Sequence, residues 1–356
     1  MKILYIFGSS RFGFTDKIEL GALPSDTMYG YFELKKMGFD VNLAYVNNDG
    51  YFYKFQELIR KILNIDLKNF KYLFYIKNYD LIIIKDEFST LITIFSKILN
   101  KKIIYIDSLL KVPNSKIKRC IYKLNLSLSD GTIVYSKTQK IELAKKFKVS
   151  ENKFIYIPYS IDCSFYKLNN DNREVDGPYI LAVGRDMARD FSTLVEAMDG
   201  LNINLKVVSL QYLFEGVNTE HHWLEILEYV SYEKLFRLYR DALFVVIPLK
   251  KWGIFYPSGI RAMLEAMTFG KTIVASRSPV LQEYANREEG VIYVEPENTL
   301  ALRNKILELC QDEGVLRDLK NSGVKTVNEK YCIDIYVSEL INFFCSIFPD
   351  RDKVLK

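Results

Sequence analysis

The feature that most constrains the fold is a regular alternation of short apolar runs with amphipathic stretches of helical length. Runs of four to six residues recur along the chain, and stretches such as 26–36, 88–99 and 137–147 separate them. The runs predicted as strands are Lys2–Phe7, Asp40–Tyr45, Leu81–Lys85, Lys102–Ile106, Gly131–Tyr135, Phe154–Ile157, Tyr179–Val183, Leu205–Val208, Leu243–Ile247, Thr272–Ala275 and Val291–Val294. Strands that alternate with helices in this way form parallel βαβ units, so we expect an α/β fold.

A polar segment interrupts the alternation at residues 168–177, and its Asn-rich composition is typical of a linker. At roughly 150 residues per domain, the chain length also suggests two domains. We therefore predict an N-terminal domain over 1–167, a linker over 168–177 and a C-terminal domain over 178–330. A helix over 331–356 would follow, either crossing back to the first domain or packing locally. The expected architecture is two doubly wound domains facing each other across a cleft.

Apolar length and cysteine spacing indicate the cellular setting. The longest apolar stretch, Ala242–Leu249, is far shorter than the ~20 residues of a membrane span. The N-terminal run ends at Gly8, too early for a secretion signal. Five cysteines lie at scattered positions without a paired motif. We therefore expect reduced thiols in a cytoplasmic protein.

Two arginines follow the strand predicted at Tyr179–Val183. Open parallel sheets bind ligands beyond the carboxyl ends of their strands. Arg185 and Arg189 lie in such a loop, and guanidinium groups bind phosphate oxygens in a bidentate manner. The alternative is that both arginines are solvated and pair with Asp186 and Asp190.

A second candidate cluster lies at the start of the helix predicted at Ile260–Phe269. Ser258 and Gly259 precede this helix, whose first backbone N–H groups form an anion site. Glu265 lies farther along among apolar residues, where a carboxylate would suit vicinal sugar hydroxyls. The alternative is an exposed helix glutamate.

These residues resemble a known family. The run SGIRAMLEAMTFGKTIVAS, residues 258–276, is similar to the donor-binding signature of retaining glycosyltransferases with the GT-B fold, more narrowly glycosyltransferase family 4, also called glycosyl transferases group 1. Other segments agree in the expected order: YILAVGR at 179–185, YVS at 229–231, DGTIVYS at 130–136 and IYIPYSID at 155–162. The resemblance implies GT-B architecture with two Rossmann-like domains.

The resemblance also assigns roles to residues of the C-terminal domain. Arg185 and Arg189 would contact the donor diphosphate and stabilise its charge during catalysis, and Glu265 would bind the nucleotide ribose. The backbone of Val230 would contact the base, and the amides of Ser258, Gly259 and Ile260 would meet the donor. The family's first glutamate would fall at Pro257, so this sequence departs from the pattern there.

The N-terminal domain would bind the acceptor. Its sequence lacks the histidine that many family members use to touch the donor sugar, and Asp107 is the nearest catalytic substitute. Asp86 and Glu87 end a strand and are assigned with Gly8 to the acceptor side. The two carboxylates would orient an acceptor hydroxyl, or would cap the following helix.

The charge is unevenly distributed. Residues 1–170 contain 27 basic and 16 acidic residues, whereas residues 171–356 contain 22 and 28. Basic residues within 51–123 are interleaved with Tyr and Phe. This composition fits an anionic membrane surface, a solvated surface above an aromatic core, or a nucleic-acid groove.

The sequence therefore predicts a retaining glycosyltransferase that moves a sugar from a nucleotide sugar, expected to be a UDP-sugar, to a glycan, lipid-linked or other membrane-associated acceptor. No bound cofactor or metal is expected, because the adjacent His221 and His222 lack the spacing of a metal site. The expected location is the cytoplasm or the inner face of the plasma membrane. The alternatives are a non-catalytic nucleotide-sugar-binding protein and a nucleotide-sugar epimerase.

Overall fold

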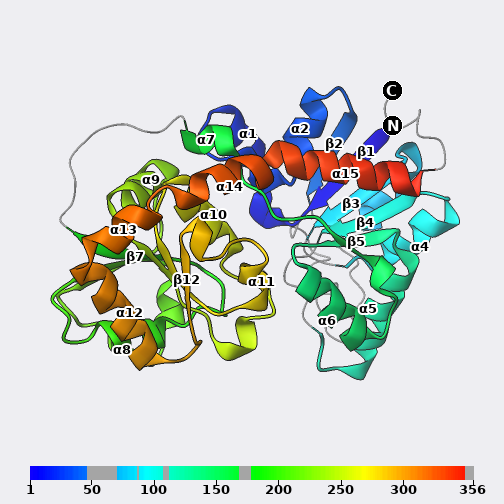
Figure 1. Cartoon of the computed structure of the whole chain (residues 1–356). Coiled ribbons are helices and arrows are strands. Elements are labelled where there is room, and N and C mark those ends of the chain that lie inside the picture. Colours follow the sequence, from blue (N-terminus) through cyan, green and yellow to red (C-terminus); the bar gives the residue numbers. More distant parts are fainter. Residues whose placement is uncertain (46–69, 86–87, 107–111, 168–177, 349–356) are drawn as a thin grey trace. The chain divides into compact units, whose positions relative to one another are not determined.

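The computed structural model describes residues 1–45, 70–85, 88–106, 112–167 and 178–348 (Figure 1). The linker predicted at 168–177 lies outside these residues. The described strands are β1 (Lys2–Phe7), β2 (Asp40–Tyr45), β3 (Leu81–Lys85), β4 (Lys102–Ile106), β5 (Gly131–Val134), β6 (Phe154–Tyr156), β7 (Tyr179–Val183), β8 (Asn204–Val208), β9 (Leu224–Leu227), β10 (Val245–Ile247), β11 (Ile273–Ser276) and β12 (Val291–Val294).

The α-helices described are α1 (Phe14–Glu19), α2 (Tyr31–Lys36), α4 (Thr90–Ile98), α5 (Lys116–Leu128), α6 (Lys137–Phe147), α7 (Cys163–Lys167), α8 (Phe191–Met198), α9 (Tyr232–Asp241), α10 (Ile260–Thr268), α11 (Pro279–Gln282), α12 (Thr299–Gln311), α13 (Glu313–Leu319), α14 (Ser322–Lys330) and α15 (Ile333–Ile347). The 3-10 turns that bear on the argument are η2 (Ser25–Met28), η3 (Phe70–Phe74) and η4 (Ile76–Asn78).

The strands form two parallel six-stranded sheets, with orders β2-β1-β3-β4-β5-β6 and β12-β11-β10-β7-β8-β9. Every predicted strand is confirmed to within two residues at each end. β9 was not predicted because this edge strand is only half-buried and its Glu225 interrupts the apolar run. Parallel sheets need crossover helices, and the amphipathic stretches supply them.

The chain divides into two compact units. Among the described residues, the first unit consists of 1–20, 27–45, 70–85, 88–106, 112–158 and 334–348, and the second consists of 21–26, 159–167 and 178–333. Each sheet lies in one unit. The short segment 21–26 therefore belongs to the second unit, although it lies early in the sequence.

The first unit places its sheet between two helical layers. Alternate residues of β1, β3 and β4, including Leu4, Ile82 and Ile103, pack with Ile92 of α4. On the opposite face, the ring of Tyr5 contacts Tyr31 of α2 edge to face. A Cβ at Gly131 of β5 would lie 2.6 Å from Phe343, so the α15 helix, red in Figure 1, packs closely on this sheet.

The stretch predicted as one helix over 26–36 is instead η2 followed by α2, so that prediction is wrong. Gly30 separates the two with a φ of 84°. A Cβ on Gly30 would lie 3.0 Å from Val337 of α15. Glycine is thus required both by the left-handed backbone and by the close packing.

The second unit has the same layered construction. Ile180 and Ala182 of β7 face a core shared with Leu194 of α8 and Leu302 of α12. On the opposite face, the Tyr179 hydroxyl donates to the Leu238 carbonyl of α9 at 2.9 Å. Because the crossover helices cover the two faces of the sheet, they leave the carboxyl ends of the strands uncovered. The candidate site lies at these ends.

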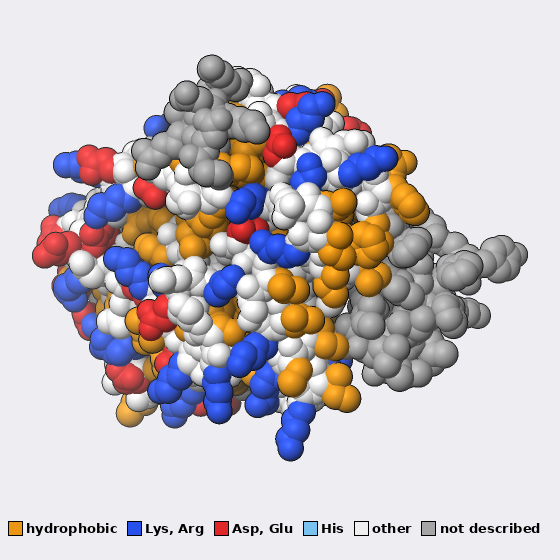
Figure 2. Space-filling view, turned by 90° about the vertical axis from the view of Figure 1, so that its right-hand side faces the viewer, with side chains coloured by type: hydrophobic (Ala, Val, Ile, Leu, Met, Phe, Trp, Pro, Cys, Tyr) orange, Lys and Arg blue, Asp and Glu red, His pale blue; other side chains and the backbone are white. Residues whose placement is uncertain are grey.

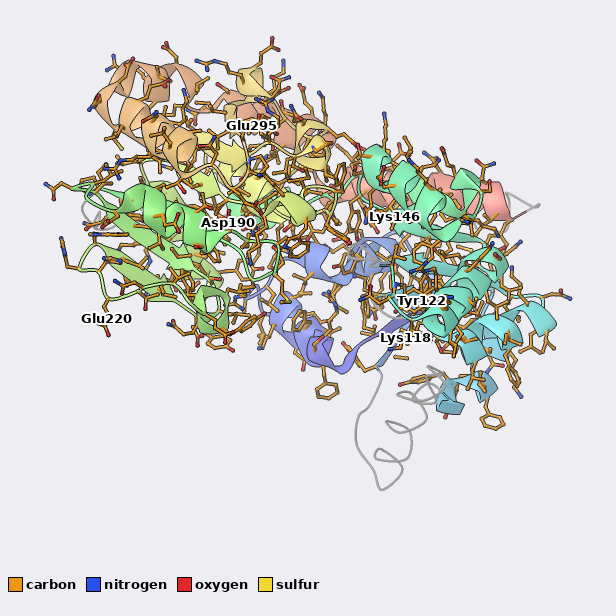
Figure 3. All side chains as sticks on the ribbon, turned by 90° about the horizontal axis from the view of Figure 1, so that it is seen from below. Lys118, Tyr122, Lys146, Asp190, Glu220 and Glu295 are labelled. Carbon is orange, nitrogen blue, oxygen red and sulfur yellow. A yellow bond between two sulfur atoms is a disulfide. The ribbon has the colours of Figure 1, made fainter. Side chains whose placement is uncertain are left out.

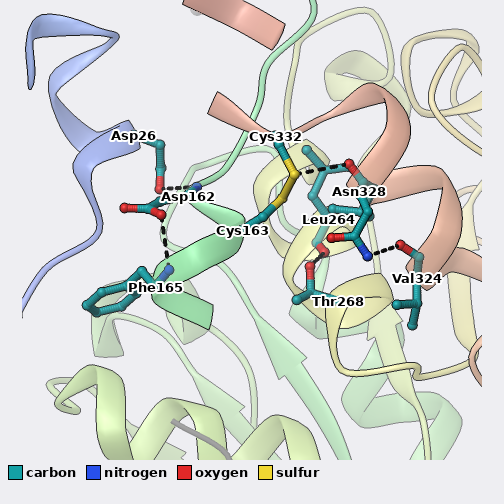
Figure 4. The surroundings of a disulfide bond; sticks show 10 residues. Asp26, Asp162, Cys163, Phe165, Leu264, Thr268, Val324, Asn328 and Cys332 are labelled. Atoms are coloured by element: carbon teal, nitrogen blue, oxygen red, sulfur yellow. Dashed lines mark hydrogen bonds between the residues drawn. A yellow bond between two sulfur atoms is a disulfide. The ribbon is translucent and has the colours of Figure 1, made fainter. Parts of the chain in front are cut away.

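A disulfide joins Cys163 to Cys332, 169 residues apart (Figure 4). The expectation that all the cysteines are reduced is therefore wrong for these two. A parallel bridge between Ile161 and Cys332 brings the segments together, and the Ile161 N–H donates to the Tyr331 carbonyl at 2.9 Å. Spacing along the sequence contains no trace of such a long-range pairing. Within the described residues, every helix is too short or too polar to cross a bilayer.

Reduction of this disulfide should destabilise the second unit by about 2–4 kcal/mol, because the cross-link limits the unfolded chain. The measurement is urea unfolding with and without dithiothreitol. A Cys163→Ser/Cys332→Ser variant should match the reduced protein and ignore the reductant. A Cys120→Ser/Cys345→Ser variant is the control and should respond like the native chain. An equal reductant effect in the Cys163→Ser/Cys332→Ser variant would contradict the pairing.

Lys271 follows α10, and its ammonium group donates to the Ala242 carbonyl at 2.8 Å. Burial lowers the pKa of Lys271 to about 8, and the nearby Lys320 charge contributes to this lowering. Above this pH the folded protein releases a proton that the unfolded chain keeps until about pH 10.4. The contribution of Lys271 to the free energy of unfolding should therefore increase as the pH rises from about 8 to 10.

We expect Lys271→Met to remove that contribution. Urea unfolding at half-unit pH intervals should show that the difference between native and variant stability changes across this window. Lys325→Met, on an exposed part of α14, is the matched control and should leave the profile unchanged. A constant difference between the native protein and Lys271→Met would mean that Lys271 titrates normally.

Candidate functional site

The candidate site occupies the carboxyl edge of the second sheet. β7 and β10 are neighbours, with Ala182 paired to Val246. The loop 184–190 after β7 and the loop 248–259 after β10 are joined by an isolated bridge between Arg189 and Leu249. Ala188 lies so close to Gly253 that a Cβ there would overlap it. The two loops thus form one continuous surface.

Arg189 is buried in this surface, with only 4% of its side chain exposed. Its Nε donates to Asp186 at 3.1 Å. A Cβ at Gly184 would overlap the guanidinium, so the glycine makes room for it. Among the described residues, Nη1 of Arg189 has no hydrogen-bond partner. A buried guanidinium with an unused donor can accept an anion without losing a bond.

Asp186 fixes both loops around that arginine. One carboxylate oxygen accepts from the Ser258 hydroxyl and, at 3.1 Å, from the Ala188 N–H. Burial would raise the pKa of Asp186, but the Arg189 charge and these hydrogen bonds outweigh it and hold the pKa below its ordinary value. Asp186 is therefore ionised at neutral pH, and its negative charge balances one positive charge. The hydrogen-bond donors of Arg189 keep their positions.

Gly259 begins α10 with a φ of 88° and no side-chain cap. A Cβ there would lie 2.8 Å from Ile247 and 3.6 Å from Nη1 of Arg189. The free donor of Arg189 therefore lies beside the first turn of α10, where backbone N–H groups carry partial positive charge. Ser258, Gly259, Ile260 and Arg189 are brought together as the sequence predicts. Their arrangement suits an anionic group.

Arg185 lies elsewhere in the same unit. Its side chain is exposed and donates to the Glu228 carbonyl after β9. Its guanidinium lies 5.2 Å from the centre of the Tyr229 ring, which is itself 80% exposed. Val230 follows directly. Arg185 is thus grouped with the predicted base-binding segment, whereas Arg189 is grouped with α10.

Glu265 is buried rather than exposed, at 3%. Its Oε1 accepts from the Tyr166 hydroxyl at 2.6 Å and from Nε of Arg261 at 2.9 Å. Its Oε2 accepts from the Tyr239 hydroxyl at 2.9 Å. Burial and the Glu265 charge raise the pKa of both tyrosines well above the ordinary value, so both stay protonated as donors.

Arg261 connects Glu265 to a second buried carboxylate, Asp26. Nη1 lies 2.9 Å from Asp26 and 2.9 Å from the Tyr159 hydroxyl. Nη2 donates to Tyr232 at 3.0 Å and to Tyr166 at 3.3 Å. Burial raises the pKa of Asp26 although the Arg261 charge lowers it. This guanidinium joins α10 to the early segment 21–26 and to residues 159–166.

The network around Arg261 was missed in the sequence. Arg261 and Glu265 have the i, i+4 spacing of a helical ion pair, which was a usable signal. Asp26, Tyr159 and Tyr166 carried none, because they approach only through the fold. Two further buried oxygens, Oδ2 of Asp190 and Oγ of Ser209, have no partner among the described residues. Asp190, labelled in Figure 3, also caps α8 through its other oxygen.

The predicted acceptor-side residues are only partly described. Asp86, Glu87 and Asp107 lie outside the described residues. Gly8 follows β1 in the first unit, and its carbonyl accepts from the Arg11 N–H at 3.2 Å. Among the described residues, a Cβ at Gly8 would meet the Ser10 hydroxyl at 3.9 Å and no other atom within 4 Å.

No cluster of His, Cys, Asp and Glu that could hold a metal ion is found among the described residues. The ring of His221 stacks on Trp223, with centroids 4.6 Å apart. The predicted independence from metals stays a prediction.

Comparison with known families gives a match within the second unit. Residues 177–312, which include Arg185, Arg189 and Glu265, match the model of the family described as Glycosyl transferases group 1. No curated protein matches the chain in sequence.

Solved structures match over almost the whole chain. Sucrose-phosphate synthase from Thermosynechococcus elongatus has a TM-score of 0.72 and 19% identity, covering 98% of this chain and 99% of that one. A glycosyltransferase from Rickettsia africae ESF-5 has a TM-score of 0.70, 16% identity and coverage of 98% and 99%. HepE from Anabaena in complex with UDP-glucose has a TM-score of 0.69, 13% identity and coverage of 98% and 100%. The predicted GT-B fold, with two Rossmann-like domains, is confirmed.

Loss of Arg261 should be costly, because it would leave the buried carboxylates Asp26 and Glu265 without their cation. We expect Arg261→Met to lower the free energy of unfolding by about 3 kcal/mol in urea. Arg237→Met removes an i, i+4 pair of the same composition, with Glu233 at 3.0 Å, but on an exposed face. This matched control should change stability by less than about 1 kcal/mol. Equal effects of the two variants would refute the role given to burial.

Proposed function

We propose that the protein is a glycosyltransferase that moves a sugar from a nucleotide-sugar donor to a glycan, lipid-linked or other membrane-associated acceptor. The observation that carries this proposal is the unused Nη1 donor of buried Arg189, which has no partner among the described residues and lies beside the first turn of α10. This arrangement suits a diphosphate, and it lies within the segment that matches Glycosyl transferases group 1.

The donor diphosphate would receive hydrogen bonds from Nη1 of Arg189 and from the backbone N–H groups of Ser258, Gly259 and Ile260. These donors are already oriented, because Asp186 holds Arg189 and Ser258. Preorganised donors stabilise the negative charge that develops on a leaving group without reorganising during the reaction. Arg185 is exposed and joins them by turning from the Glu228 carbonyl toward the diphosphate.

The nucleoside would extend toward the end of β9. Tyr229 offers an exposed ring and Val230 a backbone edge to the base. The Glu265 carboxylate would accept a hydrogen bond from a ribose hydroxyl. UDP is the nucleotide we propose, supported by the resemblance and by the UDP-glucose bound in HepE.

We propose transfer with retention of configuration. The acceptor hydroxyl would attack on the face that the leaving group occupies, and its proton would pass to the departing phosphate oxygen. The acceptor would bind the first unit, where Gly8, Asp86, Glu87 and Asp107 are the proposed contacts. Asp107 would take the place of the histidine that many family members have. Pro257 lies where the family has its first glutamate, so other groups would recognise the sugar.

The proposed location is the cytoplasm or the inner face of the plasma membrane. The Cys163–Cys332 disulfide is unusual for a reducing compartment and is the one feature that this location must accommodate.

Two alternative functions use the same donor site. A non-catalytic nucleotide-sugar-binding protein would bind UDP-sugars without transfer or hydrolysis. An epimerase would convert the sugar nucleotide in the absence of any acceptor. Product analysis with and without an acceptor distinguishes the three, and a thermal-shift panel of UDP-, GDP- and ADP-sugars identifies the donor class. A ligand at 100 times its Kd should add about 2.7 kcal/mol of stability.

We expect Arg189→Gln to lower kcat by about 100- to 1,000-fold, because it removes a preorganised charged donor. The measurement is sugar transfer from the donor found in the thermal-shift panel, with UDP binding followed by calorimetry. Arg277→Gln is the control, because Arg277 pairs with Glu295 on an exposed part of the same unit. Excess EDTA should not change the native rate. Unchanged transfer and UDP binding in a folded Arg189→Gln variant would overturn the diphosphate assignment.

A further inference from the structure

The neighbouring helices α4 and α5 of the first unit expose large apolar side chains. We call this surface the α4–α5 face: it consists of Phe95, Ile98, Leu99, Ile117 and Leu124 together with Lys116, Arg119 and Lys123. Ile98 is 68% exposed and Ile117 is 65% exposed. Phe74 and Tyr75 of η3 and its flank, packed against α4, are also exposed. Figure 2 faces this side of the first unit and shows apolar and basic side chains intermingled.

The charge of this part of the chain has a single sign. Residues 70–79, 88–106 and 112–129 contain nine Lys and Arg and no Asp or Glu. Lys97 and Lys102 pair with Asp130, at 2.9 and 3.2 Å. Lys116, Arg119 and Lys123 are exposed on α5, beside Ile117 and Leu124. Apolar and cationic side chains therefore lie together on one exposed surface, instead of the apolar side chains facing the core and the cationic ones the solvent.

A buried polar network joins the two helices of the α4–α5 face. The Thr93 hydroxyl of α4 donates to Oδ1 of Asn125 of α5 at 2.8 Å. Nδ2 of the same Asn125 donates to the Thr90 hydroxyl at 2.9 Å. The Tyr122 ring of α5, labelled with Lys118 in Figure 3, contacts Phe88 at 4.9 Å. The exposed side chains therefore project from two helices that are bonded to each other.

A surface of this composition matches an anionic lipid bilayer. Aliphatic side chains gain free energy by entering the headgroup region, and Lys and Arg gain by approaching lipid phosphates. Nucleic acid also attracts basic residues, but it needs flat rings on which bases stack. Four of the five apolar residues of the α4–α5 face are aliphatic, and bases do not stack on them: Ile98, Leu99, Ile117 and Leu124. Phe95 and the neighbouring Phe74 and Tyr75 are exposed rings, which the headgroup layer of a bilayer also accepts. Charge and shape together favour lipid.

We propose that the α4–α5 face is a docking surface for an anionic membrane. The aliphatic side chains enter the headgroup layer while the basic side chains contact lipid phosphates. The docking is reversible, because the face supplies side chains without a membrane-spanning segment. It goes beyond the proposed transfer reaction and does not depend on it, since it would operate on the protein without donor or acceptor.

The test is co-sedimentation of the full chain with vesicles of phosphatidylcholine alone and with 30 mol % phosphatidylglycerol. We expect binding to the anionic vesicles only, weakening as salt rises from 50 to 500 mM. Lys116→Gln/Arg119→Gln/Lys123→Gln should lower the partition coefficient by on the order of 100-fold. The matched control Lys320→Gln/Lys325→Gln/Lys330→Gln removes three exposed charges from the second unit and should bind like the native protein.

The apolar contribution needs its own variants. Ile98→Ser/Ile117→Ser should weaken binding at least about tenfold at constant charge, because two aliphatic side chains that enter the headgroup layer are lost. Leu300→Ser, at a position 67% exposed in the second unit, is the control. An environment-sensitive dye attached to the exposed Cys120 of α5 should shift its emission to the blue on vesicle binding. The donor affinity of every variant should stay native, which separates this test from that of the proposed function.

Three outcomes would overturn the proposal. They are binding that ignores lipid charge, equal losses in the α5 and control charge variants, and an unchanged Cys120 dye signal on vesicles. Tight binding of single-stranded RNA that Lys116→Gln/Arg119→Gln/Lys123→Gln abolishes, without vesicle binding, would assign the face to nucleic acid instead.

Discussion

The second unit depends on one partly buried guanidinium that bonds two buried carboxylates. Arg261 bonds the carboxylates of Asp26 and Glu265 and the hydroxyls of three tyrosines, and these partners come from separate parts of the sequence. Removing two carboxylates from water is costly, and here one cation and several hydroxyl donors offset the cost. The early segment 21–26 is thereby fixed to α10. The segments 21–26 and 159–166 are positioned against α10 by the same interaction.

Arg189 is buried and Arg261 is partly buried, and the hydrogen bonds of the two guanidinium groups differ. Both lie against glutamate or aspartate on the same unit, but Arg261 uses its guanidinium nitrogens on protein partners, whereas Nη1 of Arg189 has none among the described residues. An internal cross-link needs every donor satisfied. A group that binds a ligand needs one donor kept available, which is the role proposed for Arg189, and the glycines at 184 and 259 leave room beside its guanidinium. On this proposal, one unused donor nitrogen distinguishes Arg189 from Arg261.

The sequence predicted the parts of this molecule that depend on local order. Strand positions followed from apolar runs, and the start of α10 followed from Ser258 and Gly259. In the network around Arg261, only the i, i+4 pair with Glu265 had a signal in the sequence. The contact of Tyr166 with Glu265, the Cys163–Cys332 disulfide and the packing of Val337 on Gly30 could not be predicted, because each joins residues more than 90 positions apart. Glu265 illustrates the limit: its position in a helix was clear from the sequence, but whether it faced solvent or three protein donors was decided by Tyr166 and Tyr239.

The hydrogen bonds of Glu265 restrict the ribose contact that is proposed for it. An ionised carboxylate has about four acceptor positions, and Tyr166, Tyr239 and Arg261 already occupy three of them. One ribose hydroxyl can therefore be accepted without loss, whereas a bidentate contact to two vicinal hydroxyls would displace a tyrosine. Displacing Tyr166 would also remove a bond from Arg261, since both share its hydroxyl. A single hydrogen bond to one hydroxyl is consequently the contact that this network supports, and ribose binding there would be coupled to the stability of the whole cluster.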